Sequence, residues 1–312
     1  MVAELDAVRL NFDANAMFFM KFALGLIMLG VALDINPKDL KESFKQPKSI
    51  AAGLIGQFLF LPVLTYGLIL LLEPKPSIAL GMMLVAACPG GNFSNLFTLL
   101  ARGNTALSVS LTFLATILAL FMTPFNITFW GNLYPPTREL VQKVALNPKE
   151  IALTVIIVLG VPLIIGMIIR ARNIIFANKL QNFLKKFSVG FIGIVVIGAF
   201  ASNFDTFMNY IHYIVIIVFL QNFIALSTGF ITGTLLKVPK KDRRAITIEI
   251  GIQNSGLGLA LAFEFFGDLG GVALVCAWWG IWHAISGSIV AHLFTRSDKK
   301  EKAMDGSQVV YE

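Results

Sequence analysis

The sequence predicts an all-α polytopic membrane protein with nine transmembrane helices, and three observations support this fold class. Of the 312 residues, 56% are hydrophobic and only 14% are charged, whereas a soluble domain carries about 25% charged residues. Nine apolar segments reach the roughly 20 residues that an α-helix needs to cross a bilayer. Lys and Arg are concentrated in alternate connections between these segments, which is typical of chains that cross a membrane repeatedly.

The nine predicted spans are apolar segments bounded by polar or charged residues. They are Ala16–Asp34, Ser49–Leu72, Ser77–Ala101, Asn104–Phe125, Glu150–Ala171, Leu184–Asn203, Tyr210–Leu236, Arg243–Phe266 and Leu269–Thr295. Residues 1–15 are expected outside the cytoplasm. The connection from Phe125 to Glu150 is expected to be an outer loop with interfacial aromatic residues. Residues 296–312 are expected to form a polar, disordered cytoplasmic tail.

The positions of Lys and Arg predict the orientation of the chain in a cell (inner) membrane. One set of connections holds 19 of the 25 basic residues and the alternate set holds 5. The N-terminus is therefore expected outside and the C-terminus in the cytoplasm. Topology also accounts for the net charge of +7, so no nucleic-acid partner is expected, and no obligate protein partner is inferred. The two cysteines lie in apolar spans and predict neither a disulfide framework nor a zinc cluster.

Two of the predicted spans are interrupted near their middle by polar residues and glycines. The eighth span contains Ile-Glu-Ile-Gly-Ile-Gln-Asn-Ser-Gly-Leu-Gly (248–258) and the third contains Ala-Cys-Pro-Gly-Gly-Asn-Phe-Ser-Asn (87–95). An acid such as Glu249 inside a span is by default a functional-site hypothesis. Pro89 removes a backbone donor, and the glycines after it make an unwound link inexpensive. Transporters build ion sites from such broken helices, although small and polar residues also form packing seams between helices.

Four polar residues lie at a common depth. Gln57, Ser94, Thr112 and Glu249 are all roughly 9–12 Å from the inner surface, at about 1.5 Å per helical residue. Ser108 shares one helix face with Thr112, because the two are four residues apart. The oxygen-rich set could converge just inside the midplane and hold a hard monovalent cation. Neither a thiolate nor an imidazole, the ligands of soft metals, joins this set.

A half-helix begins after each interruption, at Asn92 and at Ser255. The positive ends of two half-helices meeting near the midplane favour an anionic substrate group. Spans 2 and 7 carry the related segments Gln57-Phe-Leu-Phe and Gln221-Asn-Phe-Ile, and each precedes a broken span and a final span. Spans 2–4 start inside and spans 7–9 start outside, which indicates an inverted repeat.

The segments Cys-Pro-Gly-Gly-Asn-Phe-Ser-Asn (88–95) and Glu-Ile-Gly-Ile-Gln-Asn-Ser-Gly (249–256) resemble the two crossing helices of the bile acid:sodium symporter family. The resemblance covers most of the chain. It implies a panel formed by residues 16–34 and 150–203. It also implies a core formed by residues 49–125 and 210–295, with broken helices at 77–101 and 243–266.

The resemblance also implies two sodium ions and an organic-anion substrate. The first sodium site would use Ser94, Asn95, Ser108, Thr112 and Glu249. The second would use Gln57, Glu249, Gln253 and the backbone carbonyls of Ile250 and Ile252. Substrate would bind beside Asn92, Asn254 and Ser255. Many bacterial members have ten spans, and this chain is expected to lack the first of them. It also reads Trp282-His283-Ala284 where those members often have Trp-His-Asn.

His283 is a further candidate for substrate binding or proton transfer, although a lone histidine in a span more often forms an interhelical hydrogen bond. The neighbouring tryptophans Trp278, Trp279 and Trp282 are expected to contact lipid or the panel. Cys88 precedes the proline of its break, whereas the cysteine of arsenite permeases follows it. A metalloid-permease role is therefore disfavoured.

The expected function is sodium-coupled symport of an organic anion, either bile acid-like or a small carboxylate such as pantoate or a keto acid. A proton-coupled carrier, with Glu249 carrying the proton, and a passive channel are the alternatives. No His-Glu-x-x-His motif, paired aspartates or serine–histidine constellation lies at a common depth, so no enzymatic activity is expected. Accumulation of a labelled anion against its gradient distinguishes a symporter from a channel.

Overall fold

The computed structural model describes residues 14–33, 44–91, 93–143, 147–184, 186–187, 190, 204–267 and 269–304. Regular structure within these residues is helical, apart from one isolated antiparallel bridge between Gly90 and Gln253. Five helical stretches are long and apolar enough to cross a membrane: Pro47–Leu72, Thr105–Leu133, Pro148–Arg172, Ile211–Leu235 and Gly270–Asp298. The described part of the chain is therefore helical, with several helices that suit a multi-pass membrane protein.

The helical elements follow the predicted spans closely. They are α1 (Ala14–Ala32), α3 (Pro47–Ile55), η2 (Gly56–Phe60), α4 (Leu61–Leu72), α5 (Pro76–Ala87), α6 (Phe93–Leu100), α7 (Thr105–Leu133), α8 (Pro135–Lys143), α9 (Pro148–Val155), η3 (Ile156–Gly160), α10 (Val161–Arg172), α12 (Phe204–Leu235), α13 (Lys240–Gly251), α14 (Ser255–Phe266) and α15 (Gly270–Met304). Residues 174–184 are also helical. Most of the predicted span Leu184–Asn203 lies outside the described residues.

Two predictions about connections were wrong. The segment expected to be an outer loop is largely helical, because α7 continues through Pro124 to Leu133 and α8 follows at once. Thr137 joins the two helices by donating its hydroxyl to the carbonyl oxygens of Gly131, at 2.6 Å, and Tyr134, at 2.9 Å. The tail was expected to be disordered from residue 296, but α15 continues to Met304. No proline or glycine interrupts residues 296–304.

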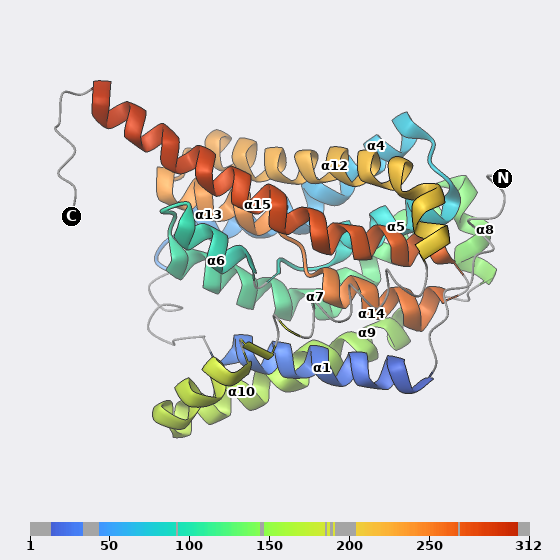
Figure 1. Cartoon of the computed structure of the whole chain (residues 1–312), viewed down its shortest axis with the longest axis horizontal. Coiled ribbons are helices and arrows are strands. Elements are labelled where there is room, and N and C mark those ends of the chain that lie inside the picture. The colour runs from blue at the N-terminus through green and yellow to red at the C-terminus, as the bar shows by residue number, and fades with distance from the viewer. Residues whose placement is uncertain are drawn as a thin grey trace.

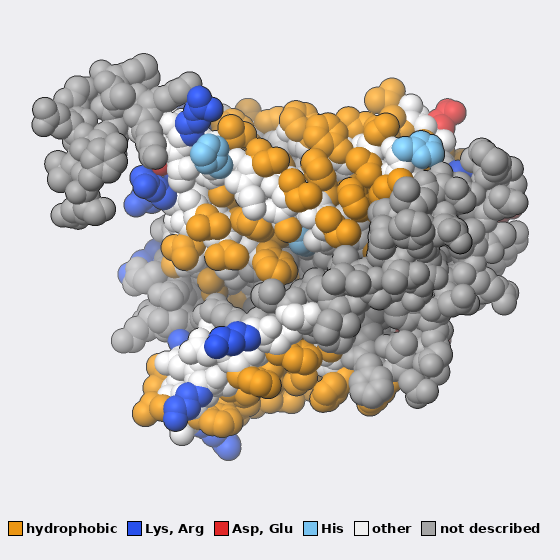
Figure 2. Space-filling view, in the orientation of Figure 1, with side chains coloured by type: hydrophobic (Ala, Val, Ile, Leu, Met, Phe, Trp, Pro, Cys, Tyr) orange, Lys and Arg blue, Asp and Glu red, His pale blue; other side chains and the backbone are white. Residues whose placement is uncertain are grey.

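The helices form two groups that lie side by side in Figure 1. α1, α9 and α10 make one layer, in which α1 packs against α10 and η3. The remaining labelled helices make a thicker body in which α5, α6, α7, α13, α14 and α15 surround the two chain interruptions. α1 begins at one end of the molecule and α15 ends at the other. On the face shown in Figure 2, Lys and Arg side chains gather toward the end where α15 stops, while apolar side chains cover the middle.

The π-helix η2 places Gln57 on the inner face of its span. Pro62 lacks an N–H, so it cannot bond to the carbonyl of Phe58 four residues earlier, and a wider turn forms just before it. Asn126 of α7 instead donates to the Phe58 carbonyl at 3.2 Å. The π-helix η3 likewise ends two residues before a proline, Pro162. Single π turns of this kind are frequent at functional sites.

Two polar clusters anchor the first turn of α13. Arg244 is buried and donates to both carboxylate oxygens of Asp298, at 2.7 and 2.6 Å, and to the carbonyl of Ala101 at 2.9 Å. Asp242 accepts hydrogen bonds from Ser49 at 2.6 Å and from Asn104 at 2.8 Å. Bidentate arginine–carboxylate pairs restrict geometry strongly. These contacts therefore fix the helix that carries Glu249 one to two turns further along.

Candidate functional site

The two interrupted helices meet through their backbones. The N–H of Gly91 donates to the carbonyl of Ile252 at 2.6 Å, and the N–H of Asn254 donates to the carbonyl of Pro89 at 2.9 Å. Both unwound links thereby satisfy backbone groups that the α-helices leave unpaired at their ends. The crossing is a two-residue antiparallel bridge buried inside the protein.

Gly90 and Gly91 are needed because other parts of the protein lie very close to their backbone, and not only because they favour an unwound chain. A Cβ atom on Gly90 would lie 2.7 Å from Cδ of Glu249, and one on Gly91 would lie 2.6 Å from the carbonyl oxygen of Gln253. Both distances are well inside van der Waals contact, and one of the two neighbours is backbone. The Pro-Gly-Gly sequence therefore lets the Glu249 carboxylate and the second link reach the crossing.

Glu249 lies at the centre of a hydroxyl cluster formed by three helices. Its carboxylate accepts a hydrogen bond from Ser94 of α6 at 2.5 Å and lies 2.8 and 3.0 Å from the hydroxyl of Thr112 of α7. The hydroxyl of Ser108 is 3.4 Å away. The carboxylate is 2% exposed. These contacts bring Ser94, Ser108 and Thr112 together around Glu249, as helix-face spacing and depth predicted for these four residues.

Two further side chains adjoin this cluster. Oδ1 of Asn95 lies 3.4 Å from the Thr112 hydroxyl, so Asn95 borders the carboxylate without touching it. Thr98 is buried and donates to the hydroxyl of Ser108 at 3.2 Å. Thr98 was not predicted. Its spacing of four residues from Ser94 on one helix face is the signal that would have found it, because Ser108 and Thr112 have the same spacing.

The second cluster pairs two glutamine amides across the crossing. Nε2 of Gln57 donates to Oε1 of Gln253 at 2.8 Å, and Nε2 of Gln253 donates back to Oε1 of Gln57 at 3.1 Å. Nε2 of Gln253 also lies 2.6 Å from the carbonyl of Ile250. Both amides are 1% exposed. The carbonyl of Ile252 is used in the backbone bridge to Gly91, so this predicted ligand already has a donor.

The candidate substrate residues border the same crossing. Asn254 caps α14 by accepting from the N–H of Leu257 at 3.0 Å, and its Nδ2 lies 3.8 Å from Sδ of Met28 on α1. Ser255 faces α15, because a Cβ on Gly280 would lie 3.0 Å from its hydroxyl oxygen. Asn254 and Ser255 are half-buried. Asn92 lies outside the described residues.

His283 packs on an aromatic ring. Its side chain is 3% exposed, and its ring centroid is 6.1 Å from that of Phe93, the first residue of α6. In the described part of the chain its Nδ1 has no hydrogen-bond partner. Of the neighbouring tryptophans, Trp279 is completely buried in the main apolar cluster, so the expected contact with lipid was wrong for this residue.

One family model matches more than half of the chain. The model of the sodium bile acid symporter family matches residues 21–210. The chain belongs to this family. The predicted family is thereby confirmed, and the first motif segment, residues 88–95, lies inside the matched region. This symporter family consists of membrane transporters rather than enzymes.

Relatives of this symporter family occur in bacteria, plants and mammals. The chain is 34% identical over 280 residues to an uncharacterized sodium-dependent transporter, YocS, of Bacillus subtilis, covering 90% of this chain and 84% of the relative. It is 29% identical to a probable sodium/metabolite cotransporter, BASS1, of Arabidopsis thaliana, with coverages of 89% and 67%. It is 26% identical to a sodium-dependent organic anion transporter of Bos taurus, with coverages of 82% and 71%. The chain therefore belongs to a family of sodium-dependent transporters.

Proposed function

We propose that the protein is a symporter that uses two sodium ions to drive the uptake of an organic anion. The observation that carries the proposal is the buried carboxylate of Glu249 at the crossing of two broken helices. Its four close contacts come from neutral hydroxyl groups. Hydroxyls orient a carboxylate but do not compensate its charge, and a buried charge is costly without a cation. A cation held beside Glu249 provides that compensation.

The chemistry of both clusters suits sodium. The first offers the Glu249 carboxylate and the hydroxyls of Ser94, Ser108 and Thr112, with the amide of Asn95 at its border. The second offers the amide oxygens of Gln57 and Gln253, the carbonyls of Ile250 and Ile252, and the shared acid Glu249. All of these are hard oxygen ligands, which alkali cations prefer to thiolates or imidazoles. We call these two proposed ligand sets the first and the second sodium cage.

The substrate is proposed to bind where α14 begins. The N-terminal end of a helix attracts anions, and the half-buried Ser255 and Asn254 stand at that end. We propose that Asn92 and His283 complete the site, with Phe93 beside the imidazole. An anion with an apolar body, such as a bile acid, or a small carboxylate, such as pantoate or a keto acid, fits this combination.

Coupling follows from the short stretch of chain between the proposed sites. Gln253 binds sodium in the proposal, and the next two residues, Asn254 and Ser255, contact the anion. An ion that orders the unwound link therefore also orders the substrate site. The binding of sodium and the binding of the anion are then linked by a coupling free energy. We further propose nine spans with the N-terminus outside. The layer of α1 and α10 serves as the panel against which the core moves.

The test is transport in proteoliposomes that contain the purified protein. A thermal-shift screen of carboxylates with and without sodium first selects a stabilising anion. That anion, labelled, is expected to accumulate above its external concentration when sodium is high outside, and to stop accumulating when potassium replaces sodium. Uptake that ignores sodium but follows a pH gradient would assign the coupling to protons. Ion current without accumulation would indicate a channel.

Removing one cage hydroxyl should weaken sodium binding selectively. Thr112→Val keeps the shape of the side chain but deletes the hydroxyl beside Glu249. We expect the sodium concentration for half-maximal uptake to rise about tenfold, the effect of losing one charge-assisted hydrogen bond. Thr116→Val is the matched control. Thr116 is equally buried on the next turn of α7 and donates only to the carbonyl of Thr112, at 2.7 Å. Equal sodium dependence in both variants would contradict the role of Thr112.

A further inference from the structure

The carbonyl that precedes each interruption is held by a side-chain amide from outside the broken pair. Nε2 of Gln57 donates to the carbonyl of Cys88 at 2.7 Å. On the other side of the crossing, Nδ2 of Asn222 on α12 donates to the carbonyl of Gly251 at 2.8 Å. Both amide side chains are 1% exposed. The two bonds are equivalent in register, because Cys88 and Gly251 each stand two residues before the bridged residue of their own link.

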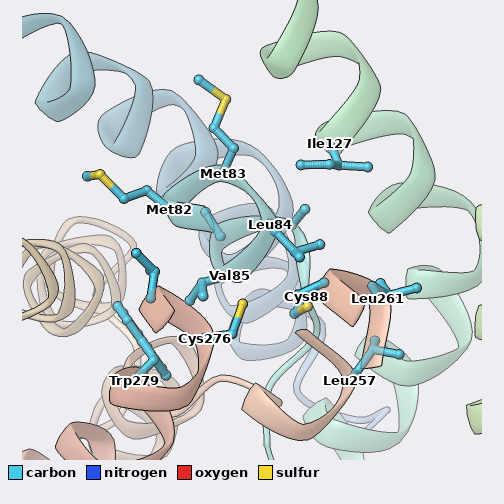
Figure 3. Close-up of a cluster of buried hydrophobic side chains, with 14 of the residues drawn as sticks. Met82, Met83, Leu84, Val85, Cys88, Ile127, Leu257, Leu261, Cys276 and Trp279 are labelled. Atoms are coloured by element: carbon cyan, nitrogen blue, oxygen red, sulfur yellow. The ribbon is translucent and has the colours of Figure 1, made fainter. Parts of the chain in front are cut away.

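The two sides of the crossing are alike in backbone but different in chemistry. If the two broken helices are aligned so that Gly90 corresponds to Gln253, Glu249 corresponds to Ala86. In the same alignment Ser94 corresponds to Leu257. Figure 3 shows Leu257 in a cluster of buried apolar side chains, near Leu261 and Cys88. The acid and the hydroxyl of the first cage therefore have apolar counterparts on the other side, although amides hold the carbonyls on both sides.

We propose that Asn222 is a positioning residue for the second sodium cage. This inference rests on the proposed function, because it assigns a role within that cage. Gly251 is the last residue of α13, and its carbonyl stands between those of Ile250 and Ile252, the two proposed backbone ligands. The Asn222 bond holds the peptide between Gly251 and Ile252. That peptide fixes the direction in which both flanking carbonyls point.

The bond matters because the carbonyl it satisfies has no partner within its own helix. The last carbonyls of an α-helix lack intrahelical donors, and a buried unpaired carbonyl destabilises the conformation that exposes it. Without Asn222 the link can rotate to find another donor, and the flanking carbonyls rotate with it. The ions then bind a link that must first be reordered, so sodium affinity falls while the maximal rate is retained.

The adjacent residue provides a matched control. Gln221 is completely buried on the same helix, and its Nε2 donates to the carbonyl of Met82 at 2.8 Å. Met82 lies in α5, more than a turn before the first break, and none of its groups belongs to either cage. Gln221→Leu therefore removes an equally buried amide-to-carbonyl bond without altering the second link.

The experiment measures thermal unfolding of the full-length protein in detergent over a range of sodium concentrations. Asn222→Leu should raise the sodium concentration for half-maximal stabilisation about tenfold, as expected for the loss of one buried hydrogen bond. In a separate transport assay at saturating sodium, the maximal uptake rate of this variant should stay within about twofold of the wild-type rate. Gln221→Leu should lower the melting temperature without sodium and keep the wild-type sodium dependence. Asn222→Ser, which shortens the donor without adding apolar bulk, should show the same sodium shift if the leucine variant is not recovered folded.

Three results would overturn the inference. Wild-type sodium dependence in both Asn222 variants would show that the Gly251 carbonyl does not position the cage. An equal shift in Gln221→Leu would show a general loss of packing instead. A wild-type protein that sodium does not stabilise at any concentration would overturn the proposed function itself, and this inference with it.

Discussion

Glu249→Gln should abolish sodium-driven accumulation of the substrate anion. The amide keeps the size of the side chain and can still hydrogen-bond to Ser94 and Thr112, but it removes the only charge shared by the two proposed cages. Loss of one partner of a buried charge pair costs about 3–5 kcal/mol, so sodium affinity should fall by about a hundredfold or more. Initial uptake rates in proteoliposomes, measured over a wide range of sodium concentrations, provide the test.

Glu264→Gln is the control for this experiment. Glu264 is the other acid in the same predicted span, and it lies about three turns beyond the crossing near the end of α14. Its substitution should leave the sodium dependence of uptake unchanged. Full sodium-driven uptake by Glu249→Gln would reject the assignment of Glu249. Uptake by the wild type in sodium-free buffer that follows pH would make Glu249 a proton carrier instead.

Gly90→Ala should have an effect nearly as large. The added methyl group would lie 2.7 Å from Cδ of Glu249, so the carboxylate must leave its hydroxyl partners or the crossing must open. Either change displaces a ligand by more than an ångström, and a loss of sodium affinity of at least about tenfold is expected. Sodium-dependent thermal stabilisation of the purified variant measures this loss directly.

Gly67→Ala serves as the comparison, since a Cβ at Gly67 meets nothing within 4 Å. Gly67 lies inside α4, where alanine has the higher helix propensity. This variant should keep the wild-type sodium dependence and unfold at the same or a slightly higher temperature. If Gly90→Ala binds sodium as the wild type does, the close approach at the crossing is not needed for the cage.

Much of the fold could be predicted because a bilayer requires helices of a certain length and apolar composition. The bounds of α3–α4 and α9–α10 differ from the predicted spans by two residues at most. The ends of α7 and α15 were harder to predict. α7 continues past Phe125 to Leu133, where the Thr137 hydroxyl bonds to the carbonyls of Gly131 and Tyr134. α15 continues through residues 296–304, which contain neither proline nor glycine. Hydropathy reports neither feature.

The hydroxyl cluster around Glu249 could be predicted for a different reason. Ser94, Thr112 and Glu249 are polar residues inside predicted spans, where burying a polar group costs free energy. The rise per residue of an α-helix gives their depth in the membrane, and this depth is similar for all three. Thr98 and Asn222 were not predicted. An isolated threonine or asparagine in a span more often bonds to its own helix or packs against a neighbouring helix than contributes to a functional site. Their roles depend on which carbonyl or hydroxyl lies opposite, and only the packed structure shows that.

The most direct test of the sodium cage is equilibrium binding of radioactive sodium to the purified protein. The proposed function predicts saturable binding of two ions per chain in the wild type, and loss of that binding in Glu249→Gln with retention in Glu264→Gln. Undiminished sodium binding by Glu249→Gln, or no saturable binding by the wild type, would contradict the account.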